Sequence, residues 1–229
     1  PEGVIAFDAA SVLVVDDKGS RWRLPKGAAA FEAATSLPPM RVDREVCTER
    51  DLFNAFGTFY ELSANNAGGF AKIRPITTHN RSIHDYCSYR GLLIMTGIAT
   101  DAAENEHIIR SDDHKAAVWA GAIDDLWSLG KPRGHGGPWA KTRVKKGKPS
   151  DPYLMMGYDQ KSLSLSASKA VTLRVEVDIT GTGNWVTYRA FELKAGEPVT
   201  DTFPVGYQAY WLRVVASGDC TATAQLQYE

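Results

Sequence analysis

The fold class of this 229-residue chain is decided by the stretch from Val171 to Ile179, which reads VTLRVEVDI. Apolar and polar side chains alternate strictly along it, as they do in a strand with one buried and one exposed face. Residues 162–166, SLSLS, alternate in the same way. Turn signals such as the glycine-rich residues 180–184 recur every 8–12 residues up to the end of the chain. This spacing predicts a β-sandwich-like module over residues 149–229.

The N-terminal part has a different pattern: pairs of strand-like runs repeat along the sequence with a loose period of about 40–50 residues. Residues 54–62 and 70–76 form one such pair, and residues 84–89 and 92–98 form another. This period is typical of β-propeller blades, so we expect an all-β protein with partial propeller blades over residues 1–148. Two or three blades cannot close a propeller. Either the missing blades belong to a removed N-terminal part, in which case the chain is the C-terminal part of a longer one, or the β units pack as an open sandwich. We favour the first alternative.

Three further expectations concern the path of the chain. Residues 115–121 and 124–130 are predicted as two more short strands, and residues 131–152 as a long exposed connection at the domain boundary. Helix is expected to be nearly absent. A partial propeller has unpaired sheet edges, which the rest of the chain or a second copy would have to cover.

The charge balance bears on the classes of partner. The chain has 26 Lys and Arg against 27 Asp and Glu, a formal net charge of −1. Nucleic-acid binding favours a cationic surface, so we expect no nucleic-acid partner. No apolar run approaches the roughly 20 residues of a membrane-spanning helix, and we expect no membrane partner. No signal-peptide pattern is present.

The three cysteines, Cys47, Cys87 and Cys220, are widely spaced and form no CxxC pair. A zinc-finger type of site is therefore not expected. We favour buried free thiols over a single disulfide, and the spacing leaves the pairing of such a disulfide open.

The strongest candidate for catalysis is the run from Thr78 to Tyr86, THNRSIHDY, at the junction of a loop and a strand. A polysaccharide lyase needs a cation beside the uronate carboxylate, a base and an acid. Arg81 would supply the cation, His79 or His84 the base, and Tyr86 the acid, with Tyr89 as a second choice for the acid. Asn80 would bind substrate. The alternative is that His84 and Tyr86 face the core.

A second candidate pairs the carboxylates Asp124 and Asp125 with the indole rings of Trp119, Trp127 and Trp139, as a glycoside hydrolase would. Adjacent residues of a strand point to opposite faces, so both carboxylates cannot belong to one catalytic pair. Packing of the tryptophans in the core is the favoured alternative.

A third candidate is the glycine-rich run of residues 133–139, RGHGGPW. It lacks the phosphate-loop pattern. We expect a mobile loop that places Arg133, His135 and Trp139 over a surface, where they would bind substrate. Trp119, outside this run, is a further predicted substrate-binding residue.

A metal site is suggested by the acidic run Asp112-Asp113-His114 and the nearby Glu104, Glu106 and His107. Carboxylates and imidazoles suit Ca²⁺ or a transition metal, but the spacing is not that of an EF-hand. We favour a solvated loop and expect no metal and no cofactor, with Ca²⁺ as a possibility that no motif supports.

The C-terminal region is rich in aromatic residues of the kind that stack on sugar rings, namely Trp185, Tyr188, Tyr207, Tyr210 and Trp211. Tyr210 and Trp211 are neighbours and face opposite ways, so at least one of them is expected in the core. Packing is favoured over sugar binding for the group as a whole.

Four segments carry a resemblance to a known group of proteins. They are residues 126–139 (LWSLGKPRGHGGPW), 149–159 (PSDPYLMMGYD), 177–185 (VDITGTGNW) and 219–225 (DCTATAQ). They resemble the C-terminal region of large uncharacterised bacterial β-propeller proteins, secreted or periplasmic, that accompany polysaccharide degradation. The resemblance implies such a location and a glycan partner, but it transfers no catalytic residue.

These observations together predict a carbohydrate-active protein, either a polysaccharide lyase or a glycoside hydrolase, with its chemistry at His79, Arg81, His84 and Tyr86. The alternative, from a different class, is a non-catalytic module that binds a glycan or mediates assembly.

Overall fold

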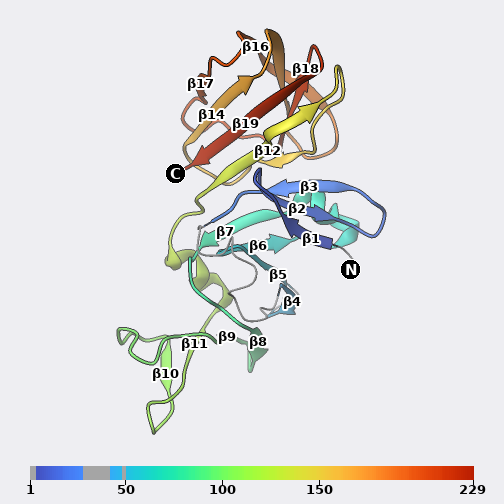
Figure 1. The fold of residues 1–229 in the computed structure, drawn as a ribbon. Coiled ribbons are helices and arrows are strands. Elements are labelled where there is room, and N and C mark those ends of the chain that lie inside the picture. Colours follow the sequence, from blue (N-terminus) through green and yellow to red (C-terminus); the bar gives the residue numbers. More distant parts are fainter. Residues whose placement is uncertain (1–3, 28–41, 48–49) are drawn as a thin grey trace. The chain divides into compact units, whose positions relative to one another are not determined.

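The computed structural model describes residues 4–27, 42–47 and 50–229. The chain forms two compact units, and the first of them is discontinuous (Figure 1). Unit 1 consists of residues 1–26 and 133–229, and unit 2 consists of residues 27–132. The elements of both units are strands and short 3-10 helices, which confirms the all-β prediction.

Unit 1 contains a seven-stranded sheet that combines strands from both ends of the chain. All its neighbouring strands are antiparallel except β3 and β13, which are parallel. In spatial order the strands are β1 (Val4–Phe7), β2 (Val12–Val15), β3 (Arg21–Leu24), β13 (Tyr153–Leu154), β18 (Trp211–Ala216), β15 (Val171–Asp178) and β16 (Trp185–Leu193).

The second sheet of unit 1 is antiparallel and has four strands. In spatial order these are β12 (Gly134–Val144), β19 (Cys220–Tyr228), β14 (Lys161–Ala167) and β17 (Val199–Thr202). The alternation seen in the sequence explains the core of this unit. Leu163 and Leu165 of β14 are buried while Ser164 between them is exposed, and Leu173 and Val175 of β15 are buried while Arg174 is exposed.

Strand β12 differs from the predicted exposed connection over residues 131–152. It pairs with β19 from Gly134 to Val144, with two register shifts. The glycines allow this close approach, because a Cβ atom on Gly137 would lie only 2.0 Å from the carbonyl oxygen of Ala224. The glycine-rich run is therefore part of a sheet. The compact units also divide at residues 26/27 and 132/133, whereas the sequence predicted one boundary at 148/149.

Unit 2 contains two four-stranded antiparallel sheets. The first is a meander of β4 (Asp43–Val46), β5 (Arg50–Ala55), β6 (Thr58–Leu62) and β7 (Arg74–Thr78). The second has the spatial order β10 (Ile108–Arg110), β11 (Ala117–Gly121), β9 (Leu92–Met95) and β8 (Tyr86–Tyr89). Propeller blades are four-stranded sheets like these two. In a blade the strands follow one another in chain order, whereas in the second sheet β11 lies between β9 and β10. The assignment to propeller blades stays a prediction.

Both sheets of unit 2 contribute to one hydrophobic core. Leu52 and Phe59 come from the first sheet, and Tyr86 and Trp119 come from the second. The predicted strand at residues 124–130 is instead a 3-10 helix, η4 (Ile123–Leu129), which places Leu126 in this core and leaves Trp127 51% exposed. The predicted return strand at residues 70–76 is also shorter, because it begins only after the 3-10 helices η2 (Asn65–Ala67) and η3 (Gly69–Lys72).

The three cysteines form no disulfide with one another; Cys47 and Cys220 are buried and Cys87 is partly exposed. Within the described ranges, the chain contains no helix that has both the length and the apolar character needed to cross a membrane.

Candidate functional site

His79 lies just after β7 and is almost fully buried in unit 2. The backbone N–H of Arg81 donates to its Nδ1 at 3.0 Å, so the ring hydrogen sits on Nε2, which lies 3.1 Å from Oδ1 of Asn54. Burial, with the charge of Arg81 as a second cause, lowers the pKa of His79 to about 3. Both nitrogens of this neutral ring are already engaged, and neither is placed to take a proton from a substrate.

Tyr86 is also a core residue. Its hydroxyl donates to the carbonyl oxygen of Leu52 at 2.6 Å, and the carbonyl oxygen of Val42 lies at 3.1 Å. The rings of Tyr86 and His79 both pack against Phe59, with centroids 5.4 and 4.7 Å from it. The structure therefore brings these two predicted catalytic residues together as packing partners around one phenyl ring.

The other residues of this run lie at the surface of unit 2. Arg81 and His84 are exposed, and Asn80 is an exposed loop residue with a φ of +50°. Only half of the predicted catalytic set is therefore accessible to a substrate, and the predicted base His79 and acid Tyr86 belong to the inaccessible half.

The predicted substrate-binding residues are divided between the two units. Trp119 belongs to unit 2, where it is buried and stacks on the ring of His107 with centroids 4.7 Å apart. Arg133, His135 and Trp139 belong to unit 1. Trp139 is buried, His135 is partly buried and pairs through its backbone with Lys26, and Arg133 is exposed. Trp119 and Trp139 are core residues, as the favoured alternative predicted.

The two acidic runs are engaged in local contacts. Asp124 forms an exposed ion pair with Arg50 at 2.7 Å, and Asp125 accepts the backbone N–H of Ala122 at 2.7 Å at the start of η4. Asp113 accepts the hydroxyl of Ser111 at 2.7 Å within a turn. In the part of the chain that the structure describes, no three His, Cys, Asp or Glu side chains come together in a way that could hold a metal ion.

The aromatic residues of unit 1 form a more accessible group. Trp211 is buried, whereas Trp185, Tyr188, Tyr207 and Tyr210 are partly exposed. The guanidinium of Arg213 lies 4.3 Å from the ring centroid of Trp185 and occupies one side of that ring. Tyr188 and Tyr207 contact each other, with ring centroids 5.3 Å apart, and so present two partly exposed rings together.

Tyr188 is directed by a β-bulge. Between the pairs Val175–Arg189 and Glu176–Thr187 the register of β15 and β16 shifts, which leaves Tyr188 unpaired in β16. Its ring packs on Phe203 and Tyr207 with centroids 4.6 and 5.3 Å away. Bulges commonly redirect a side chain in this way.

Tyr188 and its neighbours form what we call the edge cluster, because they lie where β16 borders the seven-stranded sheet and β17 borders the four-stranded sheet. Phe203 is buried beneath the two tyrosines, whose rings remain partly exposed. The members of the cluster are Tyr188, Arg189, Asp201, Phe203 and Tyr207.

The polar groups of the edge cluster are fixed in place. Arg189 donates to Oδ1 of Asp201 at 2.8 Å, and the hydroxyl of Tyr188 lies 3.4 Å from Oδ2 of Asp201. Burial and the nearby Asp201 carboxylate raise the pKa of Tyr188, and burial raises the pKa of Tyr207. Both phenols are therefore neutral donors at neutral pH. The cluster offers two aromatic rings beside a carboxylate and a guanidinium.

The sequence singled out Tyr188 and Tyr207, but it missed Arg189, Asp201 and Phe203. Residue 201 follows a turn signal in a short polar run, VTDT, that shows no apolar alternation. Only the pairing of β17 with β14 brings it to the border of the sheet, opposite Leu163.

Comparisons with known proteins add little to this geometry. No protein-family model and no curated protein matches the chain. The crystal structure of PirA aligns with 42% of this chain and 84% of its own, at 15% identity and a TM-score of 0.23. A glycoside hydrolase family 43 arabinoxylan arabinofuranohydrolase from Bacillus subtilis, in complex with cellotetraose, aligns with 100% of this chain at 8% identity and a TM-score of 0.22. This chain covers 52% of that enzyme. Both scores are too low to assign a shared fold or activity.

Proposed function

We propose that this protein binds a glycan without catalysis, through the edge cluster of unit 1. The observation that carries the proposal is the pair of partly exposed rings of Tyr188 and Tyr207, which pack on the buried Phe203 beside the fixed carboxylate of Asp201. Tyrosine combines an apolar face with a polar tip, and such rings lose little conformational entropy on binding because they have few rotatable bonds.

The polar partners complement a sugar ring. The side chain of Arg189 is 60% exposed and can donate to sugar hydroxyl groups, and the hydroxyl of Tyr207 can donate or accept. Asp201 is only 14% exposed and already accepts from Arg189 and Tyr188, so it holds these two side chains in place before the ligand arrives. A site whose groups are already in place avoids part of the entropy cost of binding.

The catalytic alternative, a lyase or a hydrolase, has weaker support. The imidazole of His79 and the hydroxyl of Tyr86 are buried and engaged with backbone or amide groups. Asp124 and Asp125 are held in separate local contacts. A binding role needs none of these residues.

The test is a binding measurement on the full chain with a panel of soluble neutral polysaccharides, by affinity electrophoresis and calorimetry. We expect binding to at least one of them, and we expect Tyr207→Ala to weaken it at least tenfold. Tyr89→Ala is the matched control, because Tyr89 is a 60% exposed tyrosine of unit 2 and its loss should change nothing. The proposal fails if Tyr207→Ala binds like the unaltered protein while circular dichroism shows that both are folded. Release of reducing ends from any member of the panel, or of unsaturated uronate from a polygalacturonate assayed beside it, would contradict the absence of catalysis.

A further inference from the structure

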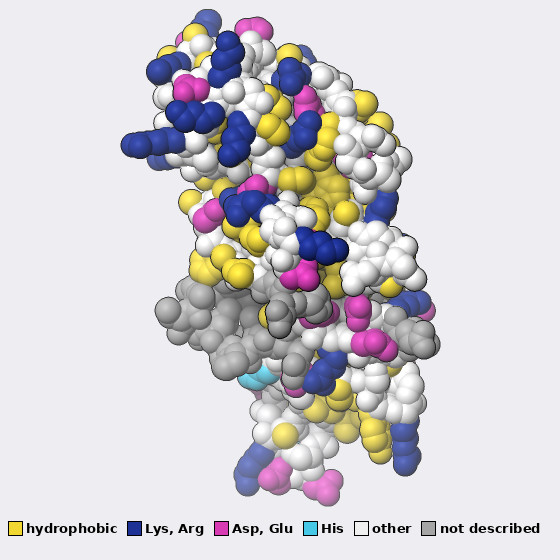
Figure 2. All heavy atoms as spheres, turned by 90° about the vertical axis from the view of Figure 1, so that its right-hand side faces the viewer, with side chains coloured by type: hydrophobic (Ala, Val, Ile, Leu, Met, Phe, Trp, Pro, Cys, Tyr) yellow, Lys and Arg dark blue, Asp and Glu magenta, His cyan; other side chains and the backbone are white. Residues whose placement is uncertain are grey.

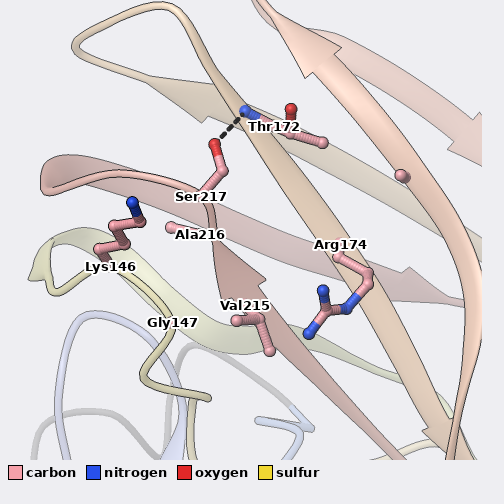
Figure 3. Close-up of a pocket in the computed structure, with 8 residues that line it drawn as sticks. Lys146, Gly147, Thr172, Arg174, Val215, Ala216 and Ser217 are labelled. Carbon is pink, nitrogen blue, oxygen red and sulfur yellow. Dashed lines mark hydrogen bonds between the residues drawn. The ribbon is translucent and has the colours of Figure 1, made fainter.

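Unit 1 also has a pocket outside the edge cluster, on the face of the seven-stranded sheet where β15, β16 and β18 run side by side. Its volume is about 450 Å³. Ala190, Val215 and Ala216 supply its apolar lining, and Lys146, Thr172, Arg174 and Ser217 supply its polar side chains (Figure 3). A pocket with an apolar lining and a few convergent polar groups is the usual form of a small-ligand site.

The polar groups of the pocket are mainly donors. The backbone N–H of Thr172 donates to Oγ of Ser217 at 2.9 Å, so the hydroxyl hydrogen of Ser217 remains free to donate. Arg174 uses its Nε on Glu176 at 2.8 Å, while its side chain is half exposed. The ammonium of Lys146 takes part in no ion pair among the described residues.

The carboxylates near the pocket are occupied by other groups. Glu176 is bound from two sides, by Arg174 and by Arg213, which donates to Oε2 at 2.7 Å. Burial acts to raise the pKa of Glu176, but the hydrogen bonds and charges of the two arginines outweigh it and lower the pKa. Asp219 pairs with Lys145 at 3.1 Å, and Glu192 accepts the hydroxyl of Thr172 at 2.9 Å.

The net charge of the segment around the pocket also favours an anionic ligand. Residues 133–229 carry 12 Lys and Arg against 9 Asp and Glu, a net charge of +3, although the whole chain has −1. In Figure 2, Lys and Arg side chains gather over the C-terminal strands of unit 1. Complementary potential of this kind raises the association rate and the specificity for anions.

We propose that this pocket binds the anionic group of an acidic glycan, a uronate carboxylate or a sulfate ester, between Lys146 and Arg174 with the hydroxyl of Ser217 as a third donor. The inference rests on the proposed glycan binding and adds the class of sugar. Guanidinium and ammonium groups form charge-assisted hydrogen bonds to such anions, and the apolar lining contacts the carbon face of the sugar ring.

The test compares two adjacent lysines by calorimetry. An oligogalacturonate, a sulfated oligosaccharide and sodium sulfate alone are titrated into the unaltered protein, Lys146→Gln and Lys145→Gln. We expect at least one acidic saccharide to bind, and Lys146→Gln to weaken that binding at least tenfold. Lys145→Gln removes the same charge from the next residue, which faces Asp219, and should change binding less than twofold. Binding should also weaken on going from 50 to 500 mM salt, roughly the range over which exposed charges become screened.

Two outcomes would overturn the proposal. One is a failure of the unaltered protein to bind either acidic saccharide, including the case in which only sodium sulfate binds, which would show an adventitious ion only. The other is an equal effect of the two lysine variants on saccharide binding. Tyr207→Ala separates this proposal from the edge cluster. Acidic binding that depends on Lys146 but not on Tyr207, without any neutral glycan binding, would reject the edge cluster and keep the pocket.

Discussion

Burial and the two hydrogen-bond partners of the His79 imidazole determine its protonation state. An N–H donor from Arg81 on one nitrogen and an acceptor from Asn54 on the other hold it in a single neutral form. Protonation would place a second donor against the N–H of Arg81 and a charge in the core of unit 2. A pair of histidines close in sequence can indicate catalysis, but a histidine whose two nitrogens are satisfied inside a core stabilises the fold instead.

This environment predicts that unit 2 loses stability in acid. The pKa of His79 is about 3 in the folded chain against an ordinary 6.5, so the unfolded state binds the proton first as the pH falls. The free energy of unfolding should therefore decrease between about pH 6.5 and 3, by up to about 1.4 kcal/mol per pH unit from this residue. Urea unfolding of the unaltered protein and of His79→Gln at pH 7, 5.5 and 4.5 measures the difference.

We expect the stability advantage of the unaltered protein over His79→Gln to shrink as the pH falls, because the variant has no imidazole to protonate. His84→Gln is the control, since His84 is exposed and lies only five residues away. Parallel pH profiles for the unaltered protein and His79→Gln would show that this histidine does not cause the acid sensitivity.

The pairing of strand β12 with β19 depends on glycine at the position of closest approach. Gly137 lies so close to β19 that a methyl group in place of its hydrogen would overlap the carbonyl group of Ala224, at 2.0 Å from the oxygen and 2.9 Å from the carbon. Displacing the backbone atoms of a paired strand would cost free energy, because the strand is held by its neighbours in the sheet. We expect Gly137→Ala to destabilise unit 1 by about 2–3 kcal/mol, the upper range for overpacking a core.

Thermal or urea unfolding measures this loss. Gly218→Ala is the matched control, because its new methyl group would meet only Val171 at an ordinary 3.4 Å. An equal, small effect of the two substitutions would mean that β12 can shift away from β19 without cost.

The elements also show what the sequence can and cannot predict. The alternation identified the buried Leu163 and Leu165 of β14 and the buried Leu173 of β15 correctly. It was wrong at the end of the 171–179 stretch, where Glu176 and Asp178 are buried and Ile179 is 56% exposed. Glycine and proline favour turns, so residues 133–139 predict a loop, whereas in the structure the glycines permit close pairing of β12 with β19. The sequence also predicts a strand at residues 124–130. The structure has a 3-10 helix there, with Leu126 on its buried side and Trp127 on its exposed side.

The candidate site was predictable only in part, for a similar reason. Tyr188 and Tyr207 could be recognised as aromatic residues of a strand and a loop. Their partner Asp201 depends on the pairing of two sheet borders, and Lys146 depends on a turn that the sequence placed in an exposed connection. Local patterns identify side chains, but long-range pairing decides which of them meet.

At the scale of the whole molecule, unit 1 is assembled from both ends of the chain. Lys26 and His135 form an antiparallel bridge with N–H to O distances of 2.9 and 3.0 Å. Arg23 on β3 binds Asp151 at 3.2 Å, just before β13. The chain therefore leaves unit 1 and returns to it at neighbouring points, with unit 2 inserted between them.

This topology predicts that unit 1 folds without unit 2. Replacing residues 27–132 by a four-residue Gly-Ser linker should preserve its fold and its glycan binding, because closing a short loop between paired ends costs little entropy. Circular dichroism, a cooperative melting transition and the binding assay test the shortened chain. Deleting residues 1–26 instead should remove β1 to β3 and prevent folding. An unfolded shortened chain would show that unit 1 needs unit 2.

The parallel pairing of β3 with β13 also has a consequence for the order of events during synthesis. Arg23 meets Tyr153 only after about 130 further residues have emerged, roughly 6–26 s at ordinary rates of translation. Unit 2 is continuous and can complete its core during that interval. Until β13 has been synthesised, the border of β3 that pairs with it stays unpaired, and an unpaired strand border can pair with other chains.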